Sequence, residues 1–228
     1  SVTSNNNNDN VTTDNRNTIN PQNDNKTSKE PENWKEIWKL VKEKCPKCKL
    51  PTKLETKEER FAQLVKYMLS GQTTDIQIDA TAQLLQENGL SVDMIRNTSE
   101  EKLTALLKGV NNAAKKTKWI KKAANVCHQK YSGDIPATYQ ELVSLSGIGP
   151  KIATMTMRFC WGENVGVAVD VHVHRVCNRL GWVHTGEDRE QTKKDIEEWL
   201  PRDLWGEFGR FYKFGQVVCT AVAPKCGE

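Results

Sequence analysis

Hydrophobic side chains recur with the period of an α-helix along most of the chain after residue 33. One apolar stripe has the spacing i, i+3, i+4, i+7 and i+8, at Phe61, Leu64, Val65, Met68 and Leu69. A second stripe has the spacing i, i+3, i+4 and i+7, at Val173, Val176, Cys177 and Leu180. No segment shows the alternation that a half-buried strand requires. The pattern therefore predicts an all-α fold with short connections.

Capping and turn residues predict where several helices begin. Pro150 suits the first position of a helix, and Asp170 stands where the next helix needs its N-cap. Two capping boxes, each a Thr followed three residues later by a Glu, are formed by Thr98 with Glu101 and by Thr138 with Glu141. Further helices are expected over residues 76–85, 190–200 and 204–218.

The composition divides the chain into unlike parts. Residues 1–33 are rich in Asn, lack aromatic residues and carry three basic against five acidic groups. Because such a segment cannot bury enough apolar surface to offset the entropy lost on ordering, we expect a disordered tail. Residues 34–60 are expected to form a linker with an N-terminal helix. Residues 61–228 are expected to form one domain.

Charge and cysteine content exclude several classes of protein. The chain of 228 residues has a net charge of +4, which permits a nucleic-acid partner without demonstrating one. No run approaches the ~18 apolar residues of a membrane span, and the N-terminus carries no signal-peptide pattern. Seven cysteines at irregular spacing favour reduced thiols or a metal site over a disulfide framework.

The segment Leu145–Ala153 predicts two helices joined by a tight turn, a helix–hairpin–helix. Gly147 and Gly149 can adopt left-handed backbone conformations and have no side chain to block a ligand. The N–H groups of the turn then suit a phosphate oxygen, which positions nucleic acid without reading its bases. Ile148 is expected to point inward and anchor the turn. The alternative is an ordinary helix–helix turn.

Lys151 and Asp170 are the candidates for covalent chemistry. Lys151 lies in the first turn of the helix after the hairpin, where the helix dipole disfavours an ammonium. If its surroundings also exclude water, its amine becomes a usable nucleophile. Asp170 begins a later helix that can meet the same cleft. The alternatives are a phosphate contact for Lys151 and a purely capping role for Asp170, although one carboxylate can fill both of its roles.

The stretch Lys108–Lys130 contains seven lysines and no acidic residue. Trp119, Ala123 and Val126 mark its inner face, so several of the lysines are expected to point outward. Such a face suits a DNA backbone, and the alternative is a solvated helix surface.

Four motifs in this order resemble the endonuclease III branch of the helix–hairpin–helix DNA glycosylases, and the eukaryotic homologues in particular. The motifs are the helix end Met68–Asp75, the hairpin Leu145–Ala153, the segment Val169–Val176 and the pair Cys219-x6-Cys226. The similarity extends from about Phe61 to Cys226.

The resemblance implies that residues 61–228 form two interleaved helical lobes that hold double-stranded DNA in the cleft between them and flip a damaged nucleotide out of the stack. It implies that Lys151 attacks C1′ of an oxidised pyrimidine nucleotide, forms a Schiff base and cuts the strand 3′ to the abasic site by β-elimination. Asp170 would stabilise positive charge on the sugar. It also implies a monomeric repair enzyme of the nucleus or the mitochondrion, with no membrane partner.

The resemblance further implies a set of DNA contacts. Gln72 matches the residue that fills the gap left by the flipped nucleotide, and Asp75 is expected to hold the same helix end. The remaining expected contacts are Thr73, Asn112, Lys116, Gly147, Ile148, Gly149 and His172. Asn111 and Asn112 depart from the family, whose members carry Gly and an apolar or aromatic wedge there. Val171 stands where this branch usually has Thr.

The resemblance implies a [4Fe-4S] cluster held by cysteines spaced C-x6-C-x2-C-x5-C. This chain has only Cys219 and Cys226 of the four, so we expect the full-length protein to carry the cluster and this chain to be a fragment that lacks it. Cys45 and Cys48 form a C-x2-C pair and are expected to be unligated thiols in the linker.

Two other functions remain open. The first is a non-catalytic DNA-binding module that retains the hairpin without the chemistry, which the altered wedge and the incomplete cysteine set favour. The second is an 8-oxoguanine glycosylase, which Val171 favours because Asp-Val-His is familiar from those enzymes. Adenine-excising relatives lack a lysine at position 151.

Overall fold

The computed structural model describes residues 30–45 and 53–226, and within these ranges every regular element is a helix. The elements are α1 (Trp34–Lys44), α2 (Lys57–Leu69), α3 (Asp75–Glu87), α4 (Val92–Asn97), α5 (Glu100–Leu106), α6 (Ala113–Lys130), α7 (Tyr139–Ser144), α8 (Pro150–Thr156), the π-helix η1 (Met157–Trp161), α9 (Val171–Arg179), α10 (Arg189–Trp199), the 3₁₀-helix η2 (Arg202–Phe208) and α11 (Gly209–Val217). The predicted all-α fold is confirmed. None of these helices combines the length and the apolar character needed to cross a bilayer.

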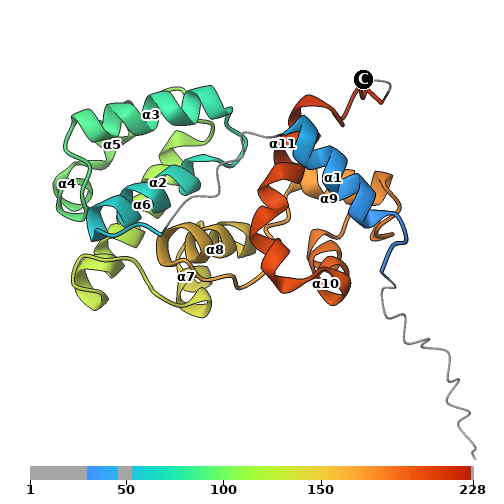
Figure 1. Cartoon of the computed structure of the whole chain (residues 1–228). Coiled ribbons are helices and arrows are strands. Elements are labelled where there is room, and N and C mark those ends of the chain that lie inside the picture. The colour runs from blue at the N-terminus through green and yellow to red at the C-terminus, as the bar shows by residue number, and fades with distance from the viewer. Residues whose placement is uncertain (1–29, 46–52, 227–228) are drawn as a thin grey trace, which may run out of the picture.

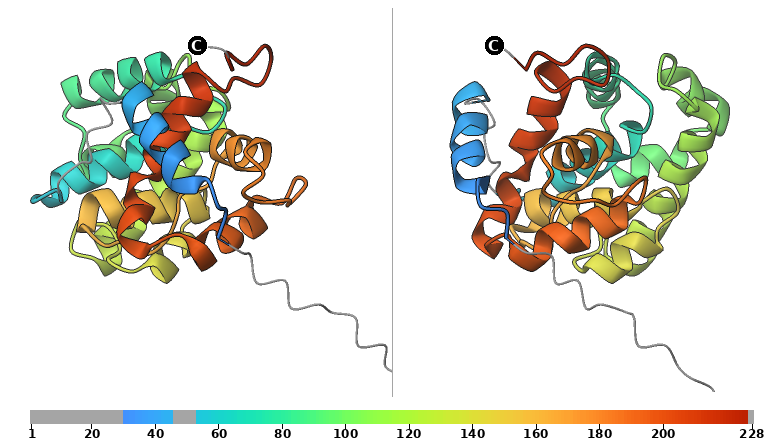
Figure 2. Two further views of the ribbon diagram at one scale, coloured as in Figure 1. Left: turned by 45° about the vertical axis from the view of Figure 1, so that its right-hand side comes forward. Right: turned by 90° about the vertical axis from the view of Figure 1, so that its right-hand side faces the viewer.

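The helices form two lobes, each with its own hydrophobic core (Figure 1). The first lobe comprises residues 53–165, and its core is built by α2 to α8. The second lobe comprises residues 30–45 and 166–226, so that α1 lies beside α11, as the views in Figure 2 also show. The two lobes are thus assembled from interleaved parts of the chain.

Helix α1 belongs to the core of the second lobe. Trp34, Trp38 and Val41 are buried, and the Trp38 ring lies 5.2 Å from that of Phe211 and 5.6 Å from that of Phe208. Buried aromatic rings contribute much of a core's stability. The segment 34–45 is therefore a structural part of the lobe and not a linker. Residues 1–29 of the expected tail lie outside the described residues.

Local signals set several helix ends. Thr138 is the N-cap of α7, as predicted, and accepts a hydrogen bond from the Glu141 N–H. The prediction for Thr98 was wrong by one residue, because Ser99 caps α5 while Thr98 ends α4 and donates to the Met94 carbonyl. Both hydroxyl residues have an extended backbone, but only Ser99 directly precedes the helix, and it accepts from the Lys102 N–H.

Helix α11 packs closely on α9 at Gly215. A Cβ at this position would lie 2.9 Å from Cβ of His172 and 3.2 Å from Cγ2 of Val176. Both neighbours belong to α9, which begins at Asp170. Only a residue without a side chain therefore allows α11 to approach the start of α9 this closely.

We expect Gly215→Ala to destabilise the protein by about 1–3 kcal/mol, because the added methyl group overpacks the α9–α11 contact. The matched control is Gly209→Ala, since a Cβ at Gly209 meets no atom within 4 Å and the residue has a right-handed helical backbone. The control should be neutral or slightly stabilising. Chemical denaturation of both variants measures the difference, and equal stabilities would contradict the packing argument.

Candidate functional site

Of the two glycines of the hairpin between α7 and α8, only Gly147 has a left-handed backbone, whereas Gly149 is extended with φ −96°. Gly147 has φ +84°, and a Cβ there would lie 2.6 Å from the Trp119 ring of α6. Ile148 is only 5% exposed and packs into the core of the first lobe. Gly149 precedes α8 and is exposed, and a Cβ added there would meet no atom within 4 Å, while Pro150 occupies the first turn as predicted. The turn therefore presents open backbone at the start of α8.

Lys151 and Asp170 meet across the boundary between the lobes. Nζ of Lys151 donates to Oδ2 of Asp170 at 3.1 Å. Lys151 lies in the first turn of α8 in the first lobe, and Asp170 is the N-cap of α9 in the second lobe. The Lys151 side chain is 33% exposed, whereas the Asp170 side chain is 9% exposed. The pair is thus reachable on the lysine side and sheltered on the carboxylate side.

The two oxygens of Asp170 have separate tasks. Oδ1 accepts from the N–H groups of His172 and Val173, both at 2.9 Å, which is the predicted N-cap. Oδ2 faces Lys151. Because the cap fixes the carboxylate, its negative charge has a defined position relative to the amine. The structure therefore combines the capping role with an electrostatic one.

The pair opens into a cavity of about 450 Å³ between the lobes. Tyr67 and Phe159 contribute aromatic rings from the first lobe, and Trp205 and Tyr212 from the second. The volume falls in the range of small-molecule sites, and a mainly apolar lining with a few polar groups is typical of them.

The π-helix η1 shapes this cavity and was not predicted. It continues α8 and carries Arg158 and Phe159 into the cavity lining. Arg158 lies so close to Gly206 of η2 that a Cβ there would be 2.6 Å from its Nε. Single π-helical turns are frequent at functional sites. No sequence signal distinguishes this turn from a normal continuation of α8.

Two loops meet at one edge of the first lobe. They bring together the predicted DNA contacts Gln72, Thr73, Asn112 and Lys116, together with Asn111. Oε1 of Gln72 accepts from Nδ2 of Asn112 at 3.3 Å and from Nδ2 of Asn111 at 3.5 Å. Thr73 Oγ1 accepts from the Asn111 N–H at 3.3 Å. Gln72 and Asn112 both have left-handed backbone conformations, with φ of 55° and 58°. The polar side chains form one exposed edge, and Lys116 lies beneath it.

Lys116 was predicted to contact DNA, but its ammonium is buried and is not accessible to a phosphate. It is only 3% exposed, and Nζ donates to the carbonyls of Leu69 and Gly71, both at 2.6 Å, and to Thr73 Oγ1 at 3.0 Å. Burial lowers the pKa of this ammonium. Lys116 is buried because it continues the buried stripe of α6 one turn before Ile120. It holds the end of α2 and the following turn in place.

The other lysines of this stretch are divided between two roles. Nζ of Lys121 donates to carbonyls at the end of α4, including that of Arg96 at 3.1 Å. Lys115 lies over the Trp119 ring at 4.9 Å. Lys118 and Lys122 are exposed. The lysine-rich face is therefore partly structural and partly open to solvent.

His172 lies beside Lys151 and Asp170, and its ring contacts two neighbouring side chains. Its Nδ1 is 3.2 Å from Arg175 Nη2, and its ring packs edge-on against Tyr212 with centroids 5.4 Å apart. His174 points elsewhere and contacts Thr192 Oγ1 and the Gly186 carbonyl. The two histidine rings therefore lie in different surroundings.

Sequence reasoning missed the part that Tyr212 and Asp75 play together. Asp75 begins α3 of the first lobe, and its Oδ1 accepts from the Tyr212 hydroxyl of α11 at 3.1 Å. Gln216 Nε2 donates to the same carboxylate at 3.3 Å. These contacts join the lobes next to Lys151, and no local pattern reveals them because the partners are 137 residues apart in the chain.

The cysteines in the described part of the chain do not assemble a cluster site. Among residues 30–45 and 53–226, no group of three or more His, Cys, Asp and Glu side chains could hold a metal ion. Cys219 and Cys226 supply two thiols, whereas a four-iron cluster is held by four. These residues alone do not fit the group, and the cluster stays a prediction. Cys45 is buried at the end of α1, and Cys48 lies outside the described residues.

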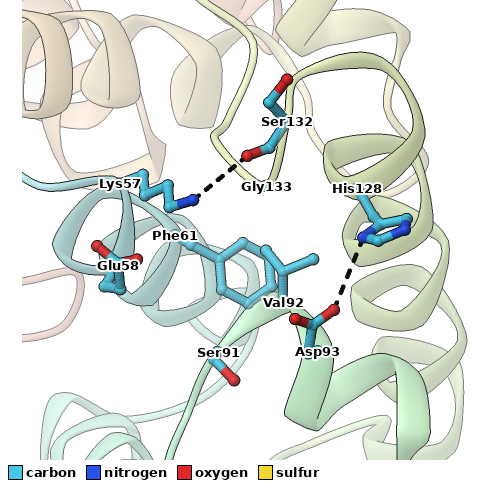
Figure 3. A pocket seen from close by; sticks show the side chains of 9 residues that line it. All are labelled: Lys57, Glu58, Phe61, Ser91, Val92, Asp93, His128, Ser132 and Gly133. Carbon is cyan, nitrogen blue, oxygen red and sulfur yellow. Dashed lines mark hydrogen bonds and ion pairs between the residues drawn. The ribbon is translucent and has the colours of Figure 1, made fainter.

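A second cavity, of about 370 Å³, lies at the opposite end of α2 (Figure 3). Phe61 lies among its lining residues, Lys57 Nζ donates to the Ser132 carbonyl at 3.4 Å, and His128 Nδ1 is 3.6 Å from Asp93 Oδ1. Of its charged groups, His128 and Asp93 face each other, and Lys57 is bonded to a backbone carbonyl. It lacks a nucleophile facing a buried carboxylate, so the interlobe cavity is the candidate site.

Comparisons with known proteins agree with this geometry. Residues 65–202 match the family described as HhH-GPD superfamily base excision DNA repair protein. "Endonuclease III-like protein 1" of Bos taurus is 43% identical over 172 residues, which cover 75% of this chain and 56% of the relative. "Endonuclease III homolog" of Schizosaccharomyces pombe is 36% identical over 215 residues, which cover 86% of this chain and 59% of the relative. The chain thus spans less than two thirds of these relatives' length.

Solved structures share the fold. The chain in "Structure of a Trapped Endonuclease III-DNA Covalent Intermediate: Estranged-Adenine Complex" matches with a TM-score of 0.76 and 24% identity, covering 84% of this chain and 89% of that one. "Structure of a thermostable thymine-DNA glycosylase" matches with a TM-score of 0.67 and 16% identity, covering 84% and 92%. Since the family profile covers more than half of the chain, this protein belongs to the HhH-GPD superfamily of base excision DNA repair proteins.

Proposed function

We propose that this chain is a bifunctional DNA glycosylase and abasic-site lyase that excises oxidised pyrimidines from double-stranded DNA. The observation that carries the proposal is the 3.1 Å contact between Nζ of Lys151 and Oδ2 of Asp170 at a cavity between two lobes. Family membership and the endonuclease III relatives support it. One of the related solved structures is a trapped covalent intermediate of endonuclease III with DNA, which fits a nucleophile in this cleft.

Base release begins when the Lys151 ammonium gives one proton to water, and the neutral amine then attacks C1′ of the flipped nucleotide. The new Nζ–C1′ bond forms as the bond between C1′ and the base nitrogen breaks, and the base leaves with that electron pair. The base takes up the proton that Nζ loses after forming the bond, so that Nζ keeps a lone pair. Positive charge develops on the sugar during this step. The fixed carboxylate of Asp170 faces that charge and stabilises it.

Strand cleavage follows from the same covalent bond. The C1′–O4′ bond opens, O4′ takes up a proton, and the nitrogen lone pair completes a positively charged C1′=Nζ Schiff base. This cation makes the C2′ proton acidic. Loss of that proton and departure of the 3′ phosphate cut the strand 3′ to the abasic site. Water then hydrolyses the Schiff base and frees Lys151.

DNA binding is assigned to two exposed features. The turn around Gly147 and Gly149 binds a backbone phosphate through N–H groups, without reading bases. The polar edge of Gln72 and Asn112 enters the duplex where the nucleotide leaves the stack. Each protomer supplies both catalytic groups, so a monomer suffices. The nucleus and the mitochondrion are the compartments proposed, because both contain DNA.

Replacing Lys151 by Gln should abolish covalent trapping and strand cleavage while DNA binding is retained, since Gln removes the nucleophile but keeps most of the side chain. The measurement is borohydride trapping on a duplex with one abasic site, together with a binding titration of the same duplex. Lys39→Gln, at an exposed lysine of α1 far from the cleft, is the matched control. Undiminished trapping by the Lys151 variant would refute the assignment.

Asp170→Asn and Asp170→Ala should separate charge from capping. Asn can still cap α9 but carries no negative charge, so we expect base excision to fall by at least about 100-fold with little change in stability. Ala should lose the same activity and also about 1 kcal/mol of stability. Single-turnover excision and denaturation midpoints measure the two effects. An Asn variant with near-normal excision would show that the charge is unimportant.

The two alternative functions make different predictions about substrate. Val171, which favours an 8-oxoguanine enzyme, is 54% exposed at the start of α9. We expect faster excision of thymine glycol than of 8-oxoguanine from otherwise identical duplexes, because the proposed substrate is an oxidised pyrimidine. The opposite ranking would favour the 8-oxoguanine alternative. Binding without excision of either base or trapping at an abasic site would favour a non-catalytic module.

A further inference from the structure

Tyr212 of α11 lies beside the proposed nucleophile, although no motif singles it out. Nζ of Lys151 is over the Tyr212 ring, 5.3 Å from its centroid. Cations within about 6 Å of an aromatic centroid are attracted to the electron-rich face of the ring. Lys151 comes from the first lobe and Tyr212 from the second, so this contact crosses the cleft next to the ion pair with Asp170.

Three neighbours hold the Tyr212 ring in this orientation. The hydroxyl donates to Oδ1 of Asp75 at 3.1 Å, and Nε2 of Gln216 donates to the hydroxyl oxygen at 2.5 Å. Gln216 also donates to Oδ2 of Asp75, which closes a triangle of hydrogen bonds. The ring of His172 packs edge-on from a third side. The position of the ring is therefore fixed by contacts from α3, α9 and α11.

The Tyr212 hydroxyl is not suited to act as an acid or a base. Burial and the nearby Asp75 carboxylate raise the pKa of Tyr212, so the phenol keeps its proton. That proton is donated to Asp75, which leaves the ring face, and not the hydroxyl, directed at Lys151. The chemistry available to Tyr212 is therefore the attraction between a π-face and a positive nitrogen.

We infer that Tyr212 is a positioning residue that holds Nζ of Lys151 in the cleft and stabilises the positive charge on this nitrogen when the Schiff base forms. The inference rests on the proposed function. Opening of the C1′–O4′ bond places the charge on the C1′=Nζ unit, at the nitrogen that the ring already faces. No proton or electron is exchanged with Tyr212 in this step.

The main competing explanation is that Tyr212 only joins the two lobes through Asp75. That role needs the hydroxyl, whereas charge stabilisation needs the ring face. Tyr212→Phe removes the first and keeps the second, and Tyr212→Leu removes both. The substitutions therefore distinguish the two explanations without altering Lys151 or Asp170.

The decisive experiment measures Schiff-base formation at a preformed abasic site. Wild-type protein and the Phe and Leu variants are mixed in excess with a duplex containing one abasic site, and borohydride-trapped adduct is followed with time. We expect Tyr212→Phe to form adduct within about twofold of the wild-type rate and Tyr212→Leu to be slower by about tenfold, which corresponds to ~1.4 kcal/mol. Denaturation midpoints establish that each variant is folded.

A second series of variants tests the inference without relying on Tyr212→Leu. Tyr212 is replaced by phenylalanine that carries no, one, two or three ring fluorines, which withdraw electrons from the ring face while hardly changing its shape. The logarithm of the adduct rate should fall steadily with each fluorine. Equal rates across the series, or a Phe variant as slow as the Leu variant, would overturn the inference while leaving the proposed function intact. Wild-type protein that binds the duplex but never forms adduct would overturn both.

Discussion

The ion pair between Lys151 and Asp170 is the constraint on which the rest of the structure depends, because its partners belong to different hydrophobic cores. Each partner stands at the start of a helix. The start of α8 is set by the hairpin, where Gly147 lies against Trp119. The start of α9 is set by Asp170 itself as its cap. The separation of amine and carboxylate is therefore fixed by how the two lobes pack.

Both helix starts carry the positive end of a helix dipole, so the dipoles have opposite effects on the Asp170 carboxylate and the Lys151 ammonium. A carboxylate at a helix N-terminus is stabilised by the dipole, whereas an ammonium there is disfavoured. Asp170 caps its own helix. The Lys151 ammonium is stabilised instead by the Asp170 carboxylate and by the ring of Tyr212, both on the other lobe. The lysine thus depends on the second lobe, and any motion that separates the lobes weakens both contacts together. This dependence couples closure of the cleft to the position of the amine.

Local signals predicted much of this arrangement, and long-range contacts account for what was missed. Pro150, Ile148 and the Asp170 cap were predicted correctly because each depends on a few neighbouring residues. Lys116 was misplaced although a signal existed, since it continues the buried stripe of α6 that includes Ile120. The contact between Asp75 and Tyr212 joins residues 137 positions apart, which no window of sequence contains, and the π-helix η1 has no local sequence signal.

The edge formed by Gln72 and Asn112 illustrates how a buried charge can organise an exposed surface. The Lys116 ammonium binds the end of α2 and Thr73, and thereby fixes the turn that carries Gln72 in its left-handed conformation. Such conformations persist only when surrounding contacts determine them. In the proposed function, the amides of the two loops, which already bond to each other, exchange these bonds for bonds to bases when they enter DNA. The proposed edge would thus recognise a gap in the duplex by hydrogen bonding and not by the stacking that an apolar wedge would provide.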